Sequence, residues 1–118
     1  MTHIDLGNDL TITDVPEGII LQWVSTDTAV VDAFIVRMSP YAVSSLDSTL
    51  SAARVEWISE DRILVISGDR SSLTLTFQMQ EPPLERMALK LDTPDAVRFR
   101  AEIAKRASEY KKSAVSEL

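Results

Sequence analysis

The chain contains no cysteine and only one histidine, His3, among its 118 residues. Without cysteine there can be no disulfide bond and no thiolate ligand for zinc or an iron–sulfur cluster. A single histidine near the start of the chain offers neither a nucleophile–base pair nor a histidine-built metal site. We therefore expect a protein that is not an enzyme and that holds no metal or other cofactor.

Glycine and long apolar runs are also scarce. The three glycines, Gly7, Gly18 and Gly68, stand far apart, whereas a phosphate-binding loop needs several within a few residues. No window of about 18 residues is apolar throughout, as a membrane-spanning helix would require. Asp5 and Asp9 occupy the positions where a secretory signal would carry basic residues and an apolar run. The sequence therefore predicts a cytoplasmic protein.

Positive charge is missing from the first third of the chain. Residues 1–36 contain no Lys or Arg against six acids, and the whole chain has a formal net charge of −6. Residues 94–118 reverse the balance, with six basic residues against four acidic ones. A protein with this negative charge repels partners that are rich in phosphate groups, so the charge argues against nucleic acid and against an anionic membrane as the partner. A protein partner or self-association fits this charge better.

The rest of the composition is ordinary for a globular protein, with 45% hydrophobic and 25% charged residues. A chain of 118 residues has room for one hydrophobic core. We expect a single domain over residues 1–118, with residues 1–8 and 112–118 as mobile ends.

From residue 10 to residue 91 apolar and polar residues alternate, which is typical of strands with one buried face. The clearest run is SLTLTFQMQ at residues 72–80. Turn-forming residues separate the runs. The predicted strands are 10–15, 19–25, 29–38, 54–59, 62–67, 72–80 and 86–91. Seven short antiparallel strands at this spacing favour a bent barrel or a sandwich, and the sequence leaves both open.

Residues 39–52, SPYAVSSLDSTLSA, interrupt the strand pattern. Ser39 could cap a short helix here. Tyr41, Leu46 and Leu50 would then form a narrow apolar stripe, and we regard these three as candidate partner-binding residues. The alternative is a serine-rich loop, since loops of this length often carry function. The sequence does not choose between the helix and the loop.

The last element is a helix predicted over about residues 94–112, with Thr93 as its N-cap. Its apolar positions recur every three or four residues and predict a buried stripe of Ala96, Phe99, Ile103, Ala107, Tyr110 and Ala114. The other face is charged, and we interpret it as solvated. Its arginines form a second set of candidate partner-binding residues: Arg98, Arg100 and Arg106.

Several strands are apolar in both phases. Trp23 and Trp57 fall in the phase that we expect to face the core. The opposite phase also carries apolar residues, namely Ile20, Val24, Ile58 and Ile66. A second apolar face needs a cover. The C-terminal helix can cover one patch, and a partner or a second copy could cover the remainder.

The carboxylates have structural explanations. Glu60, Asp61 and Asp69 fall at predicted turns, where solvation and turn formation account for them. Asp32 interrupts an apolar strand, which suits an edge strand or a bulge. The segment DLGND at residues 5–9 lacks the length and the distal glutamate of a calcium-binding loop.

Short antiparallel strands followed by one C-terminal helix resemble the pleckstrin-homology-type superfold, in which the last helix plugs one end of a bent barrel. The best local match is LKLDTPDAVRFRAEIAKR at residues 89–106, which has a last strand, a capped helix start and the aromatic Phe99. Members that bind phosphoinositides carry Lys and Arg on the first two strands. This sequence has acids there instead, including Asp14 and Glu17, so the resemblance implies no lipid recognition.

Two functions follow as hypotheses. The first is a non-enzymatic protein–protein interaction module of pleckstrin-homology-like type, an adaptor or accessory subunit that binds through a sheet edge or beside the final helix. The alternative is a structural protomer of a larger assembly, such as a phage or virus-like particle. An adaptor is expected to form small species in solution, whereas a structural protomer is expected to form large ones.

Overall fold

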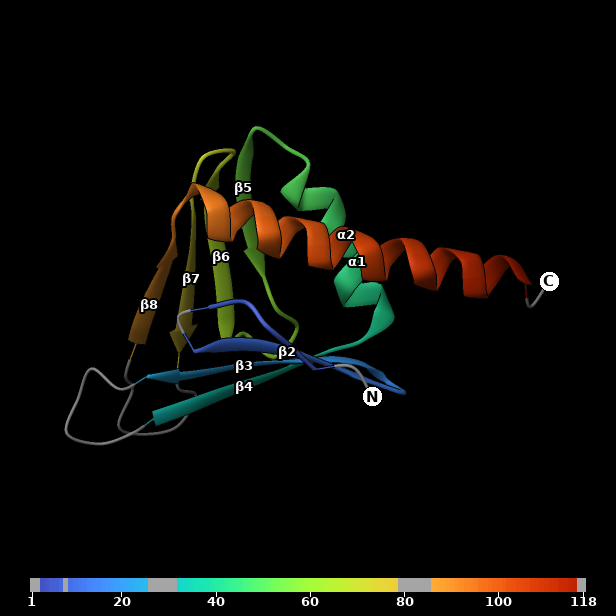
Figure 1. Cartoon of the computed structure of the whole chain (residues 1–118), viewed down its shortest axis with the longest axis horizontal. Helices are drawn as coiled ribbons and strands as arrows, with labels where there is room; N and C mark the ends of the chain where they lie inside the picture. The colour runs from blue at the N-terminus through green and yellow to red at the C-terminus, as the bar shows by residue number, and fades with distance from the viewer. Residues whose placement is uncertain (1–2, 8, 26–31, 79–85, 117–118) are drawn as a thin grey trace.

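The computed structural model describes residues 3–7, 9–25, 32–78 and 86–116. These residues form two successive units, each made of four antiparallel strands followed by one helix (Figure 1). In Figure 1 the strands of the first sheet run across the view and those of the second run steeply to them. The two helices lie on the same side of the first sheet.

The first sheet is a meander with the order β1-β2-β3-β4. Its strands are β1 (His3–Asp5), β2 (Leu10–Val15), β3 (Gly18–Ser25) and β4 (Asp32–Met38). A two-residue turn joins β2 to β3, and the register places Leu10 opposite Trp23 and Trp23 opposite Phe34. These three residues therefore share the face that is buried in the core.

The second sheet is also a meander, with the order β5-β6-β7-β8. Its strands are β5 (Arg54–Ile58), β6 (Leu64–Asp69), β7 (Leu73–Gln78) and β8 (Arg86–Leu91). The alternation read from residues 72–80 is confirmed over residues 73–78, because Leu73, Leu75 and Phe77 are fully buried while the residues between them are not. Residues 79 and 80 lie outside the described residues.

The structure confirms a mainly β fold with a C-terminal helix and corrects the strand count and the closure. The described residues form eight strands in two separate sheets, and these sheets do not close into a seven-stranded barrel. The additional strand is β1, which lies in the segment expected to be a mobile end. Its pairing with β2 brings Ile4 opposite Ile12. Three residues are too few to show a period of two, so the sequence pattern could not reveal this strand.

Residues 40–50 form the helix α1 (Pro40–Leu50), which settles the choice between helix and loop. The Ser39 hydroxyl accepts a hydrogen bond from the Ala42 amide at 3.2 Å, as the predicted cap requires. The buried residues of α1 are Ala42, Val43, Leu46 and Leu50. Tyr41 is not part of this stripe, because 78% of its surface is exposed.

The second helix, α2 (Thr93–Ser116), is longer than predicted and begins one residue earlier. Its predicted stripe is confirmed where side chains are described: Ala96, Phe99, Ile103 and Ala107 are buried and Tyr110 is partly buried. Thr93 is not the N-cap, because it is already the first residue of the helix and the Asp92 carbonyl accepts from the Ala96 amide at 2.8 Å. The Thr93 hydroxyl instead donates to the Ser71 carbonyl at 2.7 Å. Figure 1 shows α2 crossing α1 and extending beyond the rest of the fold.

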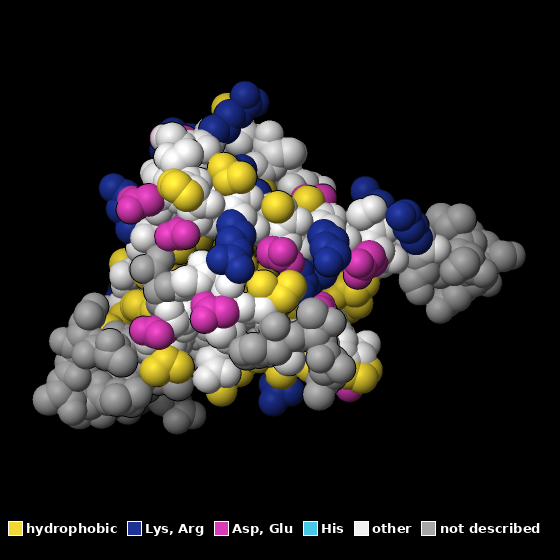
Figure 2. Space-filling view, viewed as in Figure 1, with side chains coloured by type: hydrophobic (Ala, Val, Ile, Leu, Met, Phe, Trp, Pro, Cys, Tyr) yellow, Lys and Arg dark blue, Asp and Glu magenta, His cyan; other side chains and the backbone are white. Residues whose placement is uncertain are grey.

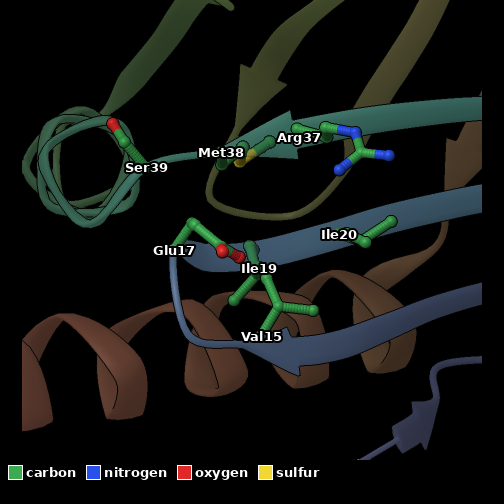
Figure 3. Close-up of a pocket in the computed structure, with 7 residues that line it drawn as sticks. All are labelled: Val15, Glu17, Ile19, Ile20, Arg37, Met38 and Ser39. Carbon is green, nitrogen blue, oxygen red and sulfur yellow. The ribbon is translucent and has the colours of Figure 1, made fainter.

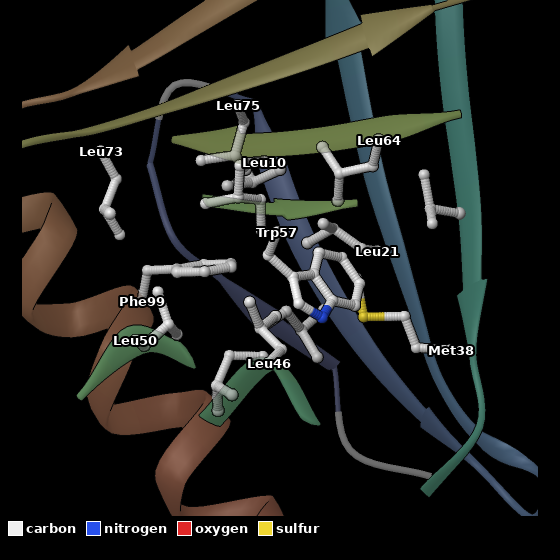
Figure 4. Close-up of a cluster of buried hydrophobic side chains, with 14 of the residues drawn as sticks. Leu10, Leu21, Met38, Leu46, Leu50, Trp57, Leu64, Leu73, Leu75 and Phe99 are labelled. Atoms are coloured by element: carbon white, nitrogen blue, oxygen red, sulfur yellow. The ribbon is translucent and has the colours of Figure 1, made fainter. Parts of the chain in front are cut away.

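The core fills the space between the sheets and the helices (Figure 4). Three rings meet where the two sheets face each other: Trp23 lies 6.0 Å from Phe34 and 5.1 Å from Phe77, measured between ring centroids. Trp57 is also buried, so the core position expected for both tryptophans is confirmed. One core shared by both sheets holds the outer faces of the strands in fixed positions.

Candidate functional site

The candidate residues of α1 do not share one surface. Leu46 and Leu50 are 0% and 3% exposed and belong to the core, whereas Tyr41 lies on the outside of the helix. Tyr41 lines a shallow groove of about 400 Å³ together with Ser44, Ser45, Ser48 and Thr49. Within the described fold, only Tyr41 of the three candidates is available to a partner.

The candidate arginines of α2 also differ from one another. Arg98 is exposed, as expected. Arg100 donates hydrogen bonds to the backbone carbonyls of Leu50 and Asp69, so it ties α2 to the end of α1 and to the turn between β6 and β7. These contacts make Arg100 part of the fold as well as of the surface.

Arg106 corrects the interpretation of the charged helix face as solvated. Only 3% of its surface is exposed, and its guanidinium donates to Asp14 of β2 and to Glu102 one turn earlier, both at 2.7 Å. Burial acts to lower the pKa of Arg106, but the hydrogen bonds that it donates to the two carboxylates, together with their negative charge, outweigh burial and raise the pKa. The remaining face of α2 carries blue and magenta side chains in alternation, with no large patch of one sign (Figure 2).

The outer face of the first sheet is the second apolar face that the sequence suggested. Ile20 and Val24 are partly buried there, and Ile35 is 50% exposed. On the second sheet Ile58 also lies outside, at 59% exposure. The expected phase was wrong for Ile66, which is fully buried, because Val65 takes the outer position opposite Ile58.

Among the strands that the structure describes, none pairs with the outer edge of β4, and the register shows which residues face this open edge. The Val24 amide donates to the Asp9 carbonyl on the β2 side of β3. Backbone groups of successive strand residues point to opposite sides, so Trp23 points to β4 and its register partner Phe34 points back to β3. By the same alternation Phe34, Val36 and Met38 bond to β3. The alternate residues Ala33, Ile35 and Arg37 therefore direct their amides and carbonyls away from the sheet.

The other described edges carry features that oppose pairing. β1 has only three residues. By the same alternation the outward positions of β8 are Arg86, Ala88 and Lys90, and those of β5 are Arg54, Glu56 and Ile58. Among the described strands, β4 thus combines length, an exposed isoleucine and the fewest charges along its outward positions.

A pocket of about 320 Å³ lies at one end of this edge (Figure 3). The side chains of Val15, Ile20 and Arg37 come from the adjacent strands β2, β3 and β4, and Glu17 comes from the turn between β2 and β3. Within the described part of the chain, no ion pair engages Arg37. An exposed guanidinium beside an apolar floor can bind a carboxylate or a carbonyl oxygen.

Ile35 and Arg37 were not among the candidate residues read from the sequence. The signal was present, because Phe34, Val36 and Met38 alternate with them. The sequence could not show that β4 is an edge strand, and only an edge makes the outward positions available to a partner. The backbone of Asp32 does start this edge strand, as its interruption of an apolar run suggested.

Within the described residues, no cluster of three or more metal-ligating side chains occurs, and neither helix is apolar over a length that could cross a membrane. No protein-family model, no curated protein and no solved structure matches this chain.

Proposed function

We propose that the protein is a non-enzymatic protein-binding module, an adaptor or accessory subunit, that binds an extended segment of a protein partner along β4. The observation that carries this proposal is the open edge formed by Ala33, Ile35 and Arg37. In strand addition, backbone hydrogen bonds to such an edge supply affinity and alternate side chains supply specificity. Here the alternate side chains of the added strand would lie beside Ile35 and extend the apolar outer face of the first sheet.

The chemistry of this face indicates what kind of segment fits. Ile35 and Ile20 favour apolar or β-branched side chains at alternate positions of the incoming strand. The exposed guanidinium of Arg37 favours an acidic residue at the end that reaches the pocket. A segment rich in Lys and Arg would leave Arg37 unpaired.

The pleckstrin-homology-like relationship is part of this proposal. It is supported by the C-terminal helix, whose Phe99 is fully buried in the core. The fold departs from the expected pattern in its eighth strand and in the helix α1 between the two sheets. Binding at β4 does not depend on this relationship, because it requires only the open edge.

Selection from a display library of random peptides tests the proposal. We expect enrichment of peptides with alternating apolar residues and an acidic residue near one end. Ile35→Lys should abolish their binding, and Ile58→Lys is the matched control, because Ile58 is also exposed (59% against 50%) on an edge strand of the other sheet. Failure to enrich any peptide, or binding that survives Ile35→Lys, would overturn the proposal.

The structural protomer is the second candidate, and the same edge favours it, because an unprotected strand edge can also join copies of one chain. Open-ended contacts between different surfaces would produce particles or fibres that grow with concentration. Light scattering over a wide concentration range separates this candidate from a binding module, which should stay small.

A further inference from the structure

We infer that the strand that pairs with β4 is the β4 of a second copy of this chain, so that two first sheets join into one continuous antiparallel sheet. This inference rests on the proposed function, because it names the occupant of the same edge. Three observations support it. The outward residues Ala33, Ile35 and Arg37 can pair with the same residues of a second copy, this pairing opposes no like charges, and the edges β1, β5 and β8 are short or charged.

The outward positions of β4 are self-complementary. Antiparallel pairing about a twofold axis at Ile35 places Ile35 opposite Ile35 of the second copy, and Ala33 opposite Arg37 in both directions. All three outward residues then lie in hydrogen-bonded positions, which gives about six interstrand hydrogen bonds at two per bonded pair. A register shifted by two residues would leave outward groups of one copy without a partner.

Charge favours the same register. Arg37 is the only Lys or Arg in residues 1–53. Pairing about Ile35 sets Arg37 of each copy opposite the uncharged Ala33 of the other, so no two like charges oppose each other at the outward positions. It also keeps the two Arg37 residues apart, because they lie on opposite sides of the axis. A parallel, in-register arrangement would instead set like charges side by side, which destabilises a sheet.

Apolar contact would accompany the backbone pairing. Ile35 is 50% exposed, and at the axis its side chain would lie beside that of Ile35 of the second copy, in a hydrogen-bonded pair. The partly buried Ile20 and Val24 extend this apolar face on each side. The interface is small, so we expect a dimer that dissociates on dilution rather than a permanent one.

The test is the solution mass of the purified full chain, measured by light scattering over about a hundredfold range of concentration. We expect the mass to rise from 13.1 kDa toward twice that value as concentration increases. Ile35→Lys should hold the mass at the monomer value, because two lysines would meet at the axis. Ile58→Lys, on the other sheet, should dimerise as the original chain does.

A second variant keeps the inference testable if a lysine at position 35 disturbs folding. Ile35→Pro removes only an outward amide, which makes no bond within the sheet, and proline is tolerated at such edge positions. Hydrogen exchange provides a readout that needs no variant: the amides of Ala33, Ile35 and Arg37 should gain protection as concentration rises.

A constant monomer mass, or a dimer that survives Ile35→Pro, would overturn the inference. If the chain is monomeric but Ile35-dependent peptides still enrich, the proposed function stands and only the identity of its partner is wrong. If neither dimer nor peptide binding depends on Ile35, both proposals fail. Growth beyond the dimer would also overturn the closed pairing and would favour the structural protomer.

Discussion

The guanidinium of Arg106 donates two hydrogen bonds to the carboxylate of Asp14, from Nε to Oδ1 at 2.7 Å and from Nη2 to Oδ2 at 3.1 Å. The two residues are 92 positions apart, so the pair fastens the C-terminal helix to the second strand. Nη1 also donates to Glu102, to its carboxylate at 2.7 Å and to its backbone carbonyl at 3.0 Å. The fork geometry is specific to arginine, because a lysine ammonium cannot make parallel bonds to one carboxylate.

Removing this pair should destabilise the fold. We expect Arg106→Met to lower the free energy of unfolding by about 1–3 kcal/mol, less than for a fully buried pair, because Asp14 remains partly solvated. Urea denaturation measures this loss, and Arg98→Met on the exposed face is the control, with a change within about 0.5 kcal/mol. Equal effects of the two substitutions would show that the ion pair contributes nothing.

The burial of α2 makes a second prediction. Phe99 is fully buried in the hydrophobic core, so Phe99→Ala should lower the free energy of unfolding by about 3–5 kcal/mol. Val97→Ala, two residues away and 55% exposed, is the matched control and should change it by less than about 1 kcal/mol. A loss below about 1 kcal/mol for Phe99→Ala would mean that α2 is not packed on the core as described.

The elements that the sequence predicted well are those with a long, regular period. The strand at residues 73–78 and the apolar stripe of α2 could be read directly, because six or more residues repeat the same spacing. The turns at Asp61 and Asp69 were also predictable, since each carboxylate accepts hydrogen bonds from the backbone two residues later.

The site could not be predicted because it depends on contacts distant in sequence. Arg106 reads as one more charge on a helix face until Asp14 is placed beside it. The outward role of Ile35 depends on β4 lying at the edge of its sheet, and strand order is not a local property of the sequence. The predicted faces of Val65 and Ile66 were the reverse of the observed ones. Both residues stand in a continuous apolar run, and such a run does not show which of its residues face the core.

Gly18 provides a test of the packing at the joint between β3, β4 and α1. Its φ of +136° is unfavourable for other residues, and an added Cβ would lie 2.0 Å from the Met38 carbonyl oxygen. Gly18→Ala should therefore lower the thermal midpoint strongly, at a cost of about 2 kcal/mol or more. Gly7→Ala is the control: its φ is also positive, but the nearest atom is 3.9 Å away, so about 1 kcal/mol is expected. Similar losses would contradict this geometry.

Asp69 makes the stability of the β6–β7 turn depend on pH. Its carboxylate accepts hydrogen bonds from the Ser71 hydroxyl at 2.7 Å and from the amides of Ser71 and Ser72, and these bonds, with the charge of Arg100, hold its pKa below 3.8. Because the folded pKa lies below the unfolded value, the stabilisation is complete above about pH 3.8 and is lost as pH falls through the folded pKa. An NMR titration of the Asp69 carboxyl carbon should give a midpoint below 3.8, and Ser71→Ala should move it upward, since the serine hydroxyl is the largest cause of the shift. A midpoint at or above 3.8 in the original chain would contradict the turn as described.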